Sequence, residues 1–386
     1  MAYKFPLSYD SWDHQEKEAI FDVVKDGFFT MGKKVKRFED QFSNYVGSKY
    51  SVMVNSGSSA NLLMVASLFY TKDNQIKLKR GDEVIVPAVS WSTSYSPLYQ
   101  YGLKIKFVDI DLGTLNYDLK KLKTAVSDKT KIILAVNLLG NPNNFKEIKK
   151  IIDKKDIVLI EDNCESLGAE FENKKAGTIG LLGTFSFFFS HHISTMEGGM
   201  IVTDNEELYH ILLSLRAHGW TRDLPEDNLL AKKSKNNFND SFKFVLPGYN
   251  LRPLEMSGAI GIIQLNKFKE FLKIRQDNAS MFLEIMKKYD DIITQKEIGT
   301  SSWFGFSLVI KPESSRSRND LVKTLNILGF ECRPIVAGNF AKNAVVDYFD
   351  YETHDDLGNA SWIDENGLFI GNHHINMNEA LKSIIL

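Results

Sequence analysis

Short β-rich segments alternate with longer helix-like segments between about residue 50 and residue 205. The predicted strands are Tyr50–Asn55, Glu83–Pro87, Lys104–Asp109, Lys131–Val136, Ile157–Asp162, Gly183–Phe189 and Gly199–Thr203. Between several of them lie helical patterns, at Ser58–Phe69, Asn116–Ala125 and Asn144–Lys154. This alternation predicts an α/β fold with a mostly parallel, seven-stranded sheet covered by helices. Ligands of such sheets bind at the carboxyl ends of the strands.

The pattern changes after this region. Residues 222–245 are polar and without a clear period, and we expect a long surface excursion there. A long apolar helical pattern begins at Glu255, and it is followed by a strand-like run at Phe304–Ile310 and helical runs at Asp320–Leu328 and Asn378–Ile385. The sequence therefore predicts a large domain at residues 1–254 and a smaller α+β domain at residues 255–386.

Composition narrows the class of protein. The chain has 386 residues, 43% of them hydrophobic and 25% charged, which is typical of a globular protein. A formal net charge of -2 gives no reason to expect nucleic acid or a membrane as partner. Cys164 and Cys332 are the only cysteines, too few for a disulfide framework or an iron–sulfur cluster. No apolar run approaches membrane-spanning length, and we expect a cytoplasmic enzyme.

Two segments carry candidate chemistry. The run Asn55-Ser-Gly-Ser-Ser-Ala-Asn61 follows one predicted strand and opens a helix, where backbone N–H groups can bind a phosphate. The same composition also makes ordinary strand-to-helix turns. The second segment is the run from Gly183 to Gly199, which contains His191-His192 and Glu197-Gly-Gly199.

The run Gly183–Gly199 resembles the cofactor-lysine segment of the nucleotide-sugar aminotransferases, which use pyridoxal phosphate (PLP). Counted back from Glu197-Gly-Gly199, the place of that lysine is His191. Histidine can move protons but cannot bond to PLP as the lysine does. The resemblance implies an aspartate aminotransferase-like fold (fold type I), non-covalent PLP or pyridoxamine phosphate, and His191 as the catalytic residue. A decayed, inactive homologue is the alternative.

The resemblance also implies roles for other positions. Gly57, Ser58 and Ser186 would bind the PLP phosphate, Trp91 would stack on the ring, and Asp162 would pair with its pyridinium nitrogen. In Gly248-Tyr-Asn-Leu-Arg252, Asn250 would reach the phosphate of the other subunit, so that the protein is a homodimer with shared active sites. Arg252 would pair with the carboxylate of an amino donor, L-glutamate, and His218 would contact the substrate or the amino donor. Arg333 is a candidate sugar contact, together with Asn339 and Phe340. No metal is implied.

The strings around His191-His-Ile-Ser-Thr-Met-Glu-Gly-Gly199 and Glu331–Phe340 resemble one branch of this family more closely. Its members are 3-dehydratases of colitose and O-antigen (lipopolysaccharide) biosynthesis. They remove the C3 hydroxyl from a GDP-linked 4-keto-6-deoxy sugar and release ammonia and 2-oxoglutarate. Three alternatives stay open: an aminotransferase of the same fold, a non-enzymatic regulatory protein, and a nucleotide-binding protein without PLP.

Overall fold

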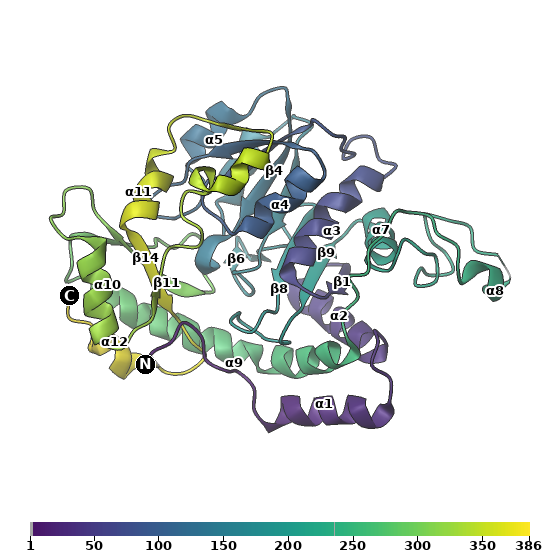
Figure 1. The fold of residues 1–386 in the computed structure, drawn as a ribbon, viewed down its shortest axis with the longest axis horizontal. Helices are drawn as coiled ribbons and strands as arrows, with labels where there is room; N and C mark the ends of the chain where they lie inside the picture. The colour runs from purple at the N-terminus through teal and green to yellow at the C-terminus, as the bar shows by residue number, and fades with distance from the viewer. Residues whose placement is uncertain (1–2, 235) are drawn as a thin grey trace.

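The computed structural model describes residues 3–234 and 236–386, and its middle layer is an eight-stranded sheet (Figure 1). The strand order is β1-β9-β8-β5-β4-β2-β3-β13. The strands are β1 (Tyr50–Val54), β2 (Glu83–Pro87), β3 (Lys104–Val108), β4 (Thr130–Val136), β5 (Val158–Asp162), β8 (Leu182–Ser186), β9 (Gly199–Thr203) and β13 (Tyr351–Thr353). Neighbours run parallel except that β9 is antiparallel to both β1 and β8.

All seven predicted strands are present, with ends close to the predicted ones. The sheet is one strand wider than the seven that we predicted, because β13 from the C-terminal part pairs in parallel with β3. This strand has only three residues, Tyr-Glu-Thr, with exposed Tyr351 and Thr353. No hydrophobic period marks so short an edge strand, which is why the sequence pattern missed it.

Helices cover both faces of the sheet. The helices before residue 255 are α1 (His14–Asp26), α2 (Lys33–Val46), α3 (Gly57–Tyr70), α4 (Ser92–Gln100), α5 (Leu119–Ala125), α6 (Phe145–Ile151), α7 (Glu206–Arg216) and α8 (Asn237–Asp240). Side chains alternate along each strand: Val84 and Val86 of β2 pack with α3, α4 and α7, and Ile85 packs with α5 and α6. Helix α2 covers the other end of that second face.

The C-terminal part has its own sheet and core. Its helices are α9 (Glu255–Met286), α10 (Arg318–Ile327), α11 (Gly358–Asn366) and α12 (Asn378–Lys382). An antiparallel sheet has the order β10 (Ile292–Thr294), β11 (Gly305–Ile310), β14 (Gly367–Gly371) and β12 (Cys332–Arg333). A small hairpin, β6 (Glu170–Phe171) with β7 (Lys174–Lys175), lies in the N-terminal part.

The predicted domain boundary at residue 254 coincides with the start of α9, and the division stays a prediction. Segments on each side of this boundary pair with the part of the chain on the other side. Phe5 N–H donates to Gly329 O in the C-terminal part, while β13 belongs to the large sheet.

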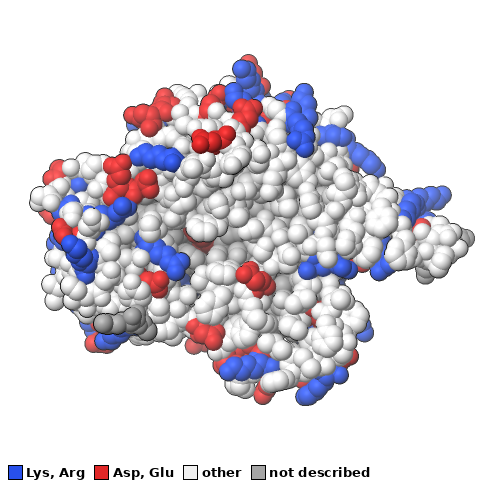
Figure 2. All heavy atoms as spheres, in the orientation of Figure 1, with Lys and Arg blue, Asp and Glu red and all other residues white. Residues whose placement is uncertain are grey.

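The polar stretch 222–245 leaves the body beside α7 and contains α8 (Figure 1). Phe238, Phe242 and Phe244 are exposed on it, and Phe238 reaches 85%. On the face in Figure 2, basic and acidic side chains are interspersed. In the part of the chain that the structure describes, no helix has the length and hydropathy needed to cross a bilayer.

Candidate active site

The phosphate-binding turn and the end of β8 are in direct contact. Ser56 caps α3, since its side chain accepts a hydrogen bond from Ser59 N–H. A Cβ added at Gly57 would lie 2.6 Å from Ser186 Cβ and 2.9 Å from Ser186 Oγ. The first N–H groups of α3 lack helical acceptors, so they can bind an anion beside the Ser186 hydroxyl. The structure thus brings together Gly57, Ser58 and Ser186, the three predicted phosphate ligands.

Asp162 ends β5 and is almost completely buried. Its Oδ2 accepts hydrogen bonds from Asn61 Nδ2 at 2.8 Å and Ser94 Oγ at 2.7 Å, and its Oδ1 accepts one from Cys164 N–H at 3.1 Å. These three donors suit an ionised carboxylate, which only accepts. Asn61 closes the same motif as Gly57, but neither Asn61 nor Ser94 was predicted to be a site residue.

Trp91 lies at the start of α4, just after β2, and its side chain is 58% exposed. The first turn of α4 is joined to α3 by the hydrogen bond from Asn61 Nδ2 to Thr93 O. An indole this exposed at the edge of the Asp162 network is available to stack on a planar ligand.

His191 follows β8 and lies between two phenylalanine rings. Its ring centroid is 5.9 Å from that of Phe188 and 5.2 Å from that of Phe304, both edge to face. Nδ1 is buried and has no hydrogen-bond partner among the described residues, so Nε2 is the ring nitrogen that can face the site. Burial, and then the charge of Arg275, lower the pKa of His191 to about 4. The ring is therefore neutral at physiological pH, with a lone pair to accept a proton.

Glu165 is a further candidate residue that the sequence analysis missed. Its Oε2 accepts a hydrogen bond from Leu139 N–H at 3.0 Å. Burial raises the pKa of Glu165 to about 7, and the nearby Asp162 adds to this rise. Its sequence position, three residues after Asp162, was the only signal available. A carboxyl group that titrates near neutral pH beside Asp162 is typical of a functional site.

His218, Asn250 and Arg252 form a separate cluster around Trp220. The His218 ring is 4.9 Å from the Trp220 ring, and the Arg252 guanidinium is 5.5 Å from the same ring. Arg252 Nε donates to Asn250 Oδ1 at 3.0 Å, and Asn250 is exposed. The backbone between them is tied to the phosphate-binding turn, because Asn55 N–H donates to Leu251 O. Among the described residues, no hydrogen bond joins these side chains to His191 or Asp162.

The candidate sugar contacts lie apart from this cluster. Arg333 is on β12 with an exposed side chain, and its guanidinium binds Glu331. Asn339 is buried and caps a short 3₁₀ helix, and Phe340 packs in the core against Tyr95. Phe340 therefore packs as a core residue, and its contact with the sugar stays a prediction. The sequence offered no way to tell its buried ring from an exposed one.

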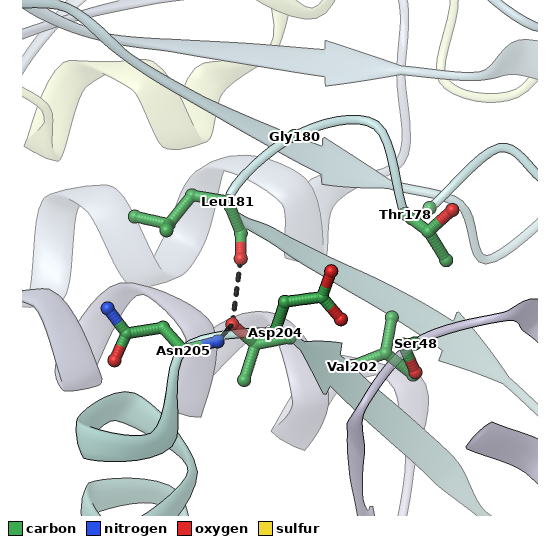
Figure 3. Close-up of a pocket in the computed structure, with 9 residues that line it drawn as sticks. Ser48, Thr178, Gly180, Leu181, Val202, Asp204 and Asn205 are labelled. Carbon is green, nitrogen blue, oxygen red and sulfur yellow. Dashed lines mark hydrogen bonds between the residues drawn. The ribbon is translucent and has the colours of Figure 1, made fainter. Parts of the chain in front are cut away.

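A small pocket of about 120 Å³ lies where β8 begins and β9 ends (Figure 3). Ser48, Gly180, Leu181 and Asp204 are among its lining residues, and Thr203 Oγ1 donates to Leu181 O across it. Gly180 and Leu181 precede β8, whereas His191 follows it. This pocket therefore lies at the opposite end of β8 from His191, and it contains none of the predicted site residues.

Comparisons with known proteins agree with this geometry. The profile of the DegT/DnrJ/EryC1/StrS aminotransferase family matches residues 10–385. GDP-4-keto-6-deoxy-D-mannose 3-dehydratase of Escherichia coli O55:H7 is 60% identical over 375 residues, 97% of this chain and 96% of that protein. The E. coli enzyme with bound hydrated PLP has a TM-score of 0.97 at 59% identity, covering 99% of this chain and 98% of that one. A structure of GDP-4-keto-6-deoxymannose-3-dehydratase with a trapped PLP–glutamate geminal diamine has a TM-score of 0.96 at 58% identity, covering 99% and 100%.

Proposed function

The chain belongs to the DegT/DnrJ/EryC1/StrS aminotransferase family, and we propose that it is the 3-dehydratase of GDP-4-keto-6-deoxy-D-mannose. It uses PLP and L-glutamate to remove the C3 hydroxyl, and the products are a GDP-linked 4-keto-3,6-dideoxy sugar, 2-oxoglutarate and ammonia. Such a product is a precursor of colitose in O-antigen biosynthesis. The observation that carries this proposal is a histidine, His191, at the place where the family pattern has its lysine, after β8 and between the rings of Phe188 and Phe304.

The residues present fit PLP. The absence of a side chain at Gly57 leaves a cradle beside Ser186 that a Cβ would fill, and Ser58 adds a second N–H donor for the phosphate. Asp162 supplies a buried carboxylate for the pyridinium nitrogen, and Trp91 an exposed ring for its face. When bound, PLP stabilises the negative charge that remains after a proton leaves an adjacent carbon.

His191 has the task of moving that proton. Its Nε2 accepts the proton because the ring is neutral, and it returns the proton in the other half of the reaction. Asp162 would keep the ring nitrogen of the cofactor protonated, and Phe304 and Phe188 flank the His191 ring edge to face. A histidine forms no lasting covalent bond to the cofactor, so nothing at this position is suited to completing an amination of the sugar.

The amino donor and the second subunit complete the proposal. Arg252 presents a guanidinium fork that suits the α-carboxylate of glutamate, with His218 beside it. Asn250 is exposed, and we infer that it reaches the phosphate bound by a second copy of the chain. The exposed Phe238, Phe242 and Phe244 support such a homodimer, because large apolar side chains rarely gather on a free surface. Both cysteines are free thiols, which suits the cytoplasm, the location we propose.

Product stoichiometry tests this function. The protein is incubated with PLP, L-glutamate and GDP-4-keto-6-deoxy-D-mannose, and ammonia and 2-oxoglutarate are quantified. A dehydratase releases one of each for every sugar converted. Formation of 2-oxoglutarate without ammonia would show that the amino group stays on the sugar, and the proposal would fail.

A further inference from the structure

His192, the second histidine of the doublet, is 2% exposed and cannot exchange protons freely with a substrate. Its Nε2 lies 3.1 Å from the carbonyl oxygen of Ser302. This hydrogen bond requires the proton on Nε2, because a carbonyl only accepts. Burial, and then the charge of Arg275, lower the pKa of His192 well below its usual value. The ring is therefore a neutral, fixed donor to residue 302.

Ser302 belongs to the segment Ser301–Phe304, which precedes β11 and bridges the two parts of the chain. Ser302 N–H donates to Gly140 O at 2.9 Å, and Phe304 N–H donates to Leu139 O at 3.0 Å. Trp303 has a φ of +49°, a left-handed conformation that is unfavourable for a large side chain. Neighbouring contacts must hold such a segment in place.

Arg275 of α9 supplies one of these contacts. Its Nη1 donates to Phe304 O at 3.3 Å and to Asn372 O at 2.7 Å. The side chain is 4% exposed, and no salt bridge joins it to a carboxylate of the described residues. A buried guanidinium without a carboxylate partner is costly. Its position is explained if it serves to hold Phe304, whose ring contacts both His191 and His192.

We propose that His192 and Arg275 are positioning residues for His191, which hold the Ser301–Phe304 segment so that the Phe304 ring fixes the His191 imidazole. This inference rests on the proposed function of His191 as the group that moves the proton. It accounts for the second histidine of the doublet, which is buried and donates to the carbonyl oxygen of Ser302.

The test compares His192→Phe with His192→Gln. Phenylalanine keeps a ring but loses the donor, whereas glutamine retains an N–H at nearly the position of Nε2. The conversion of bound PLP by glutamate is followed by absorbance. We expect His192→Phe to lower the rate constant at saturating glutamate about tenfold, since small displacements of reacting groups have effects of this size or larger. KM for glutamate should change less than about threefold, and His192→Gln should restore most of the rate.

His373→Phe is the matched control. His373 is also buried near Arg275, but its ring contacts Tyr9 instead of Phe304. Equal rate losses in His192→Phe and His373→Phe would show a general packing effect and overturn the proposal, as would a wild-type rate in folded His192→Phe. If His192→Phe does not fold, Arg275→Lys and Arg275→Met replace it, with the larger loss expected for methionine and equal rates overturning the proposal.

A readout independent of turnover uses the protein without cofactor. Histidines labelled with ¹³C at Cε1 give one NMR signal per ring, and His191→Asn identifies the signal of His191. We expect His192→Phe to move this signal and His373→Phe to leave it in place. The His191→Asn variant also separates the two proposals: if it keeps full turnover the proposed function fails, and if it is inactive while His192→Phe behaves as wild type only the positioning role fails.

Discussion

The backbone of Gly57 lies against the side chain of Ser186, so close that a Cβ at position 57 would be 2.6 Å from Ser186 Cβ. This contact joins the start of α3 to the end of β8, two segments that are far apart in the sequence. It places the N–H groups of a helix and a hydroxyl around one small cradle, beside the segment that carries His191.

Gly57→Ala tests this cradle directly. We expect the added methyl group to displace Ser186, to lower the melting temperature by several degrees, and to weaken PLP binding at least tenfold. Ser186→Gly in the same chain removes the atoms that clash. The double variant should therefore recover the melting temperature but not the affinity for PLP, which differential scanning fluorimetry and absorbance titration measure. A stable Gly57→Ala variant with unchanged affinity would contradict the contact.

Asp162→Asn removes a charge while keeping nearly the same shape. We expect the rate of PLP conversion by glutamate to fall about a hundredfold or more, because the cofactor's pyridinium nitrogen loses its anionic partner. Ser94→Ala is the control, since it removes one neutral hydrogen bond to the same carboxylate. A single bond of this kind is worth about 1 kcal/mol, which corresponds to roughly a fivefold change. Equal losses in the two variants would show that charge is not the deciding property.

Buried histidines make stability depend on pH. The pKa of His373 is lowered to about 3, those of His191 and His374 to about 4, and that of His192 well below its usual value, mainly by burial. In the unfolded chain a histidine titrates near about 6.5, so between pH 6.5 and 4 only the unfolded chain binds these protons. The stability that these neutral histidines contribute is therefore complete above pH 6.5. It is lost as pH is lowered, by up to about 1.4 kcal/mol per pH unit for each histidine.

Glu165 acts in the opposite direction, because its raised pKa of about 7 lets the folded chain bind a proton first. Burial also raises the pKa of Glu161 and lowers that of His210, so two carboxyl groups oppose five histidines. Urea unfolding at pH 7.5, 6 and 5 measures the slope, and His373→Asn should make the slope shallower. A free energy of unfolding that stays constant between pH 7 and 5 would contradict the buried, neutral histidines.

Arg252→Lys should weaken binding of glutamate. Lysine keeps the charge but cannot form two parallel hydrogen bonds to a carboxylate, so we expect KM for glutamate to rise about tenfold. Turnover of enzyme preloaded with pyridoxamine phosphate should stay unchanged, because that half of the reaction does not use glutamate. Arg222→Lys is the control, since Arg222 also stacks on Trp220, at 4.1 Å. An equal rise in both variants would assign the effect to the aromatic stack.

Much of the fold could be predicted from the sequence, because strong local signals mark it. The seven longer strands of the large sheet and α9 have clear hydrophobic periods, and the turn at Gly57 and the carboxylate at Asp162 come at strand ends. The short β13 has no such period, and its pairing depends on β3 more than two hundred residues earlier in the chain.

The contacts of the site were harder to predict. Ser94 binds Asp162, and the Ser301–Phe304 segment contacts the histidine doublet, only because distant parts of the chain fold together. Phe340 shows that a sequence motif does not reveal whether a side chain is buried. A phenylalanine within a matching string can be buried in the core, and the string alone does not give its exposure.

The mass of the sugar product tests the central claim most directly. Wild-type protein is incubated with PLP, L-glutamate and GDP-4-keto-6-deoxy-D-mannose, and the product is analysed by mass spectrometry beside a His191→Asn control. We predict a product that lacks one oxygen atom in the wild-type reaction and unchanged substrate in the control. A product in which an amine has replaced the ketone would show that the histidine at position 191 does not prevent amination, and the account given for His191 would be wrong.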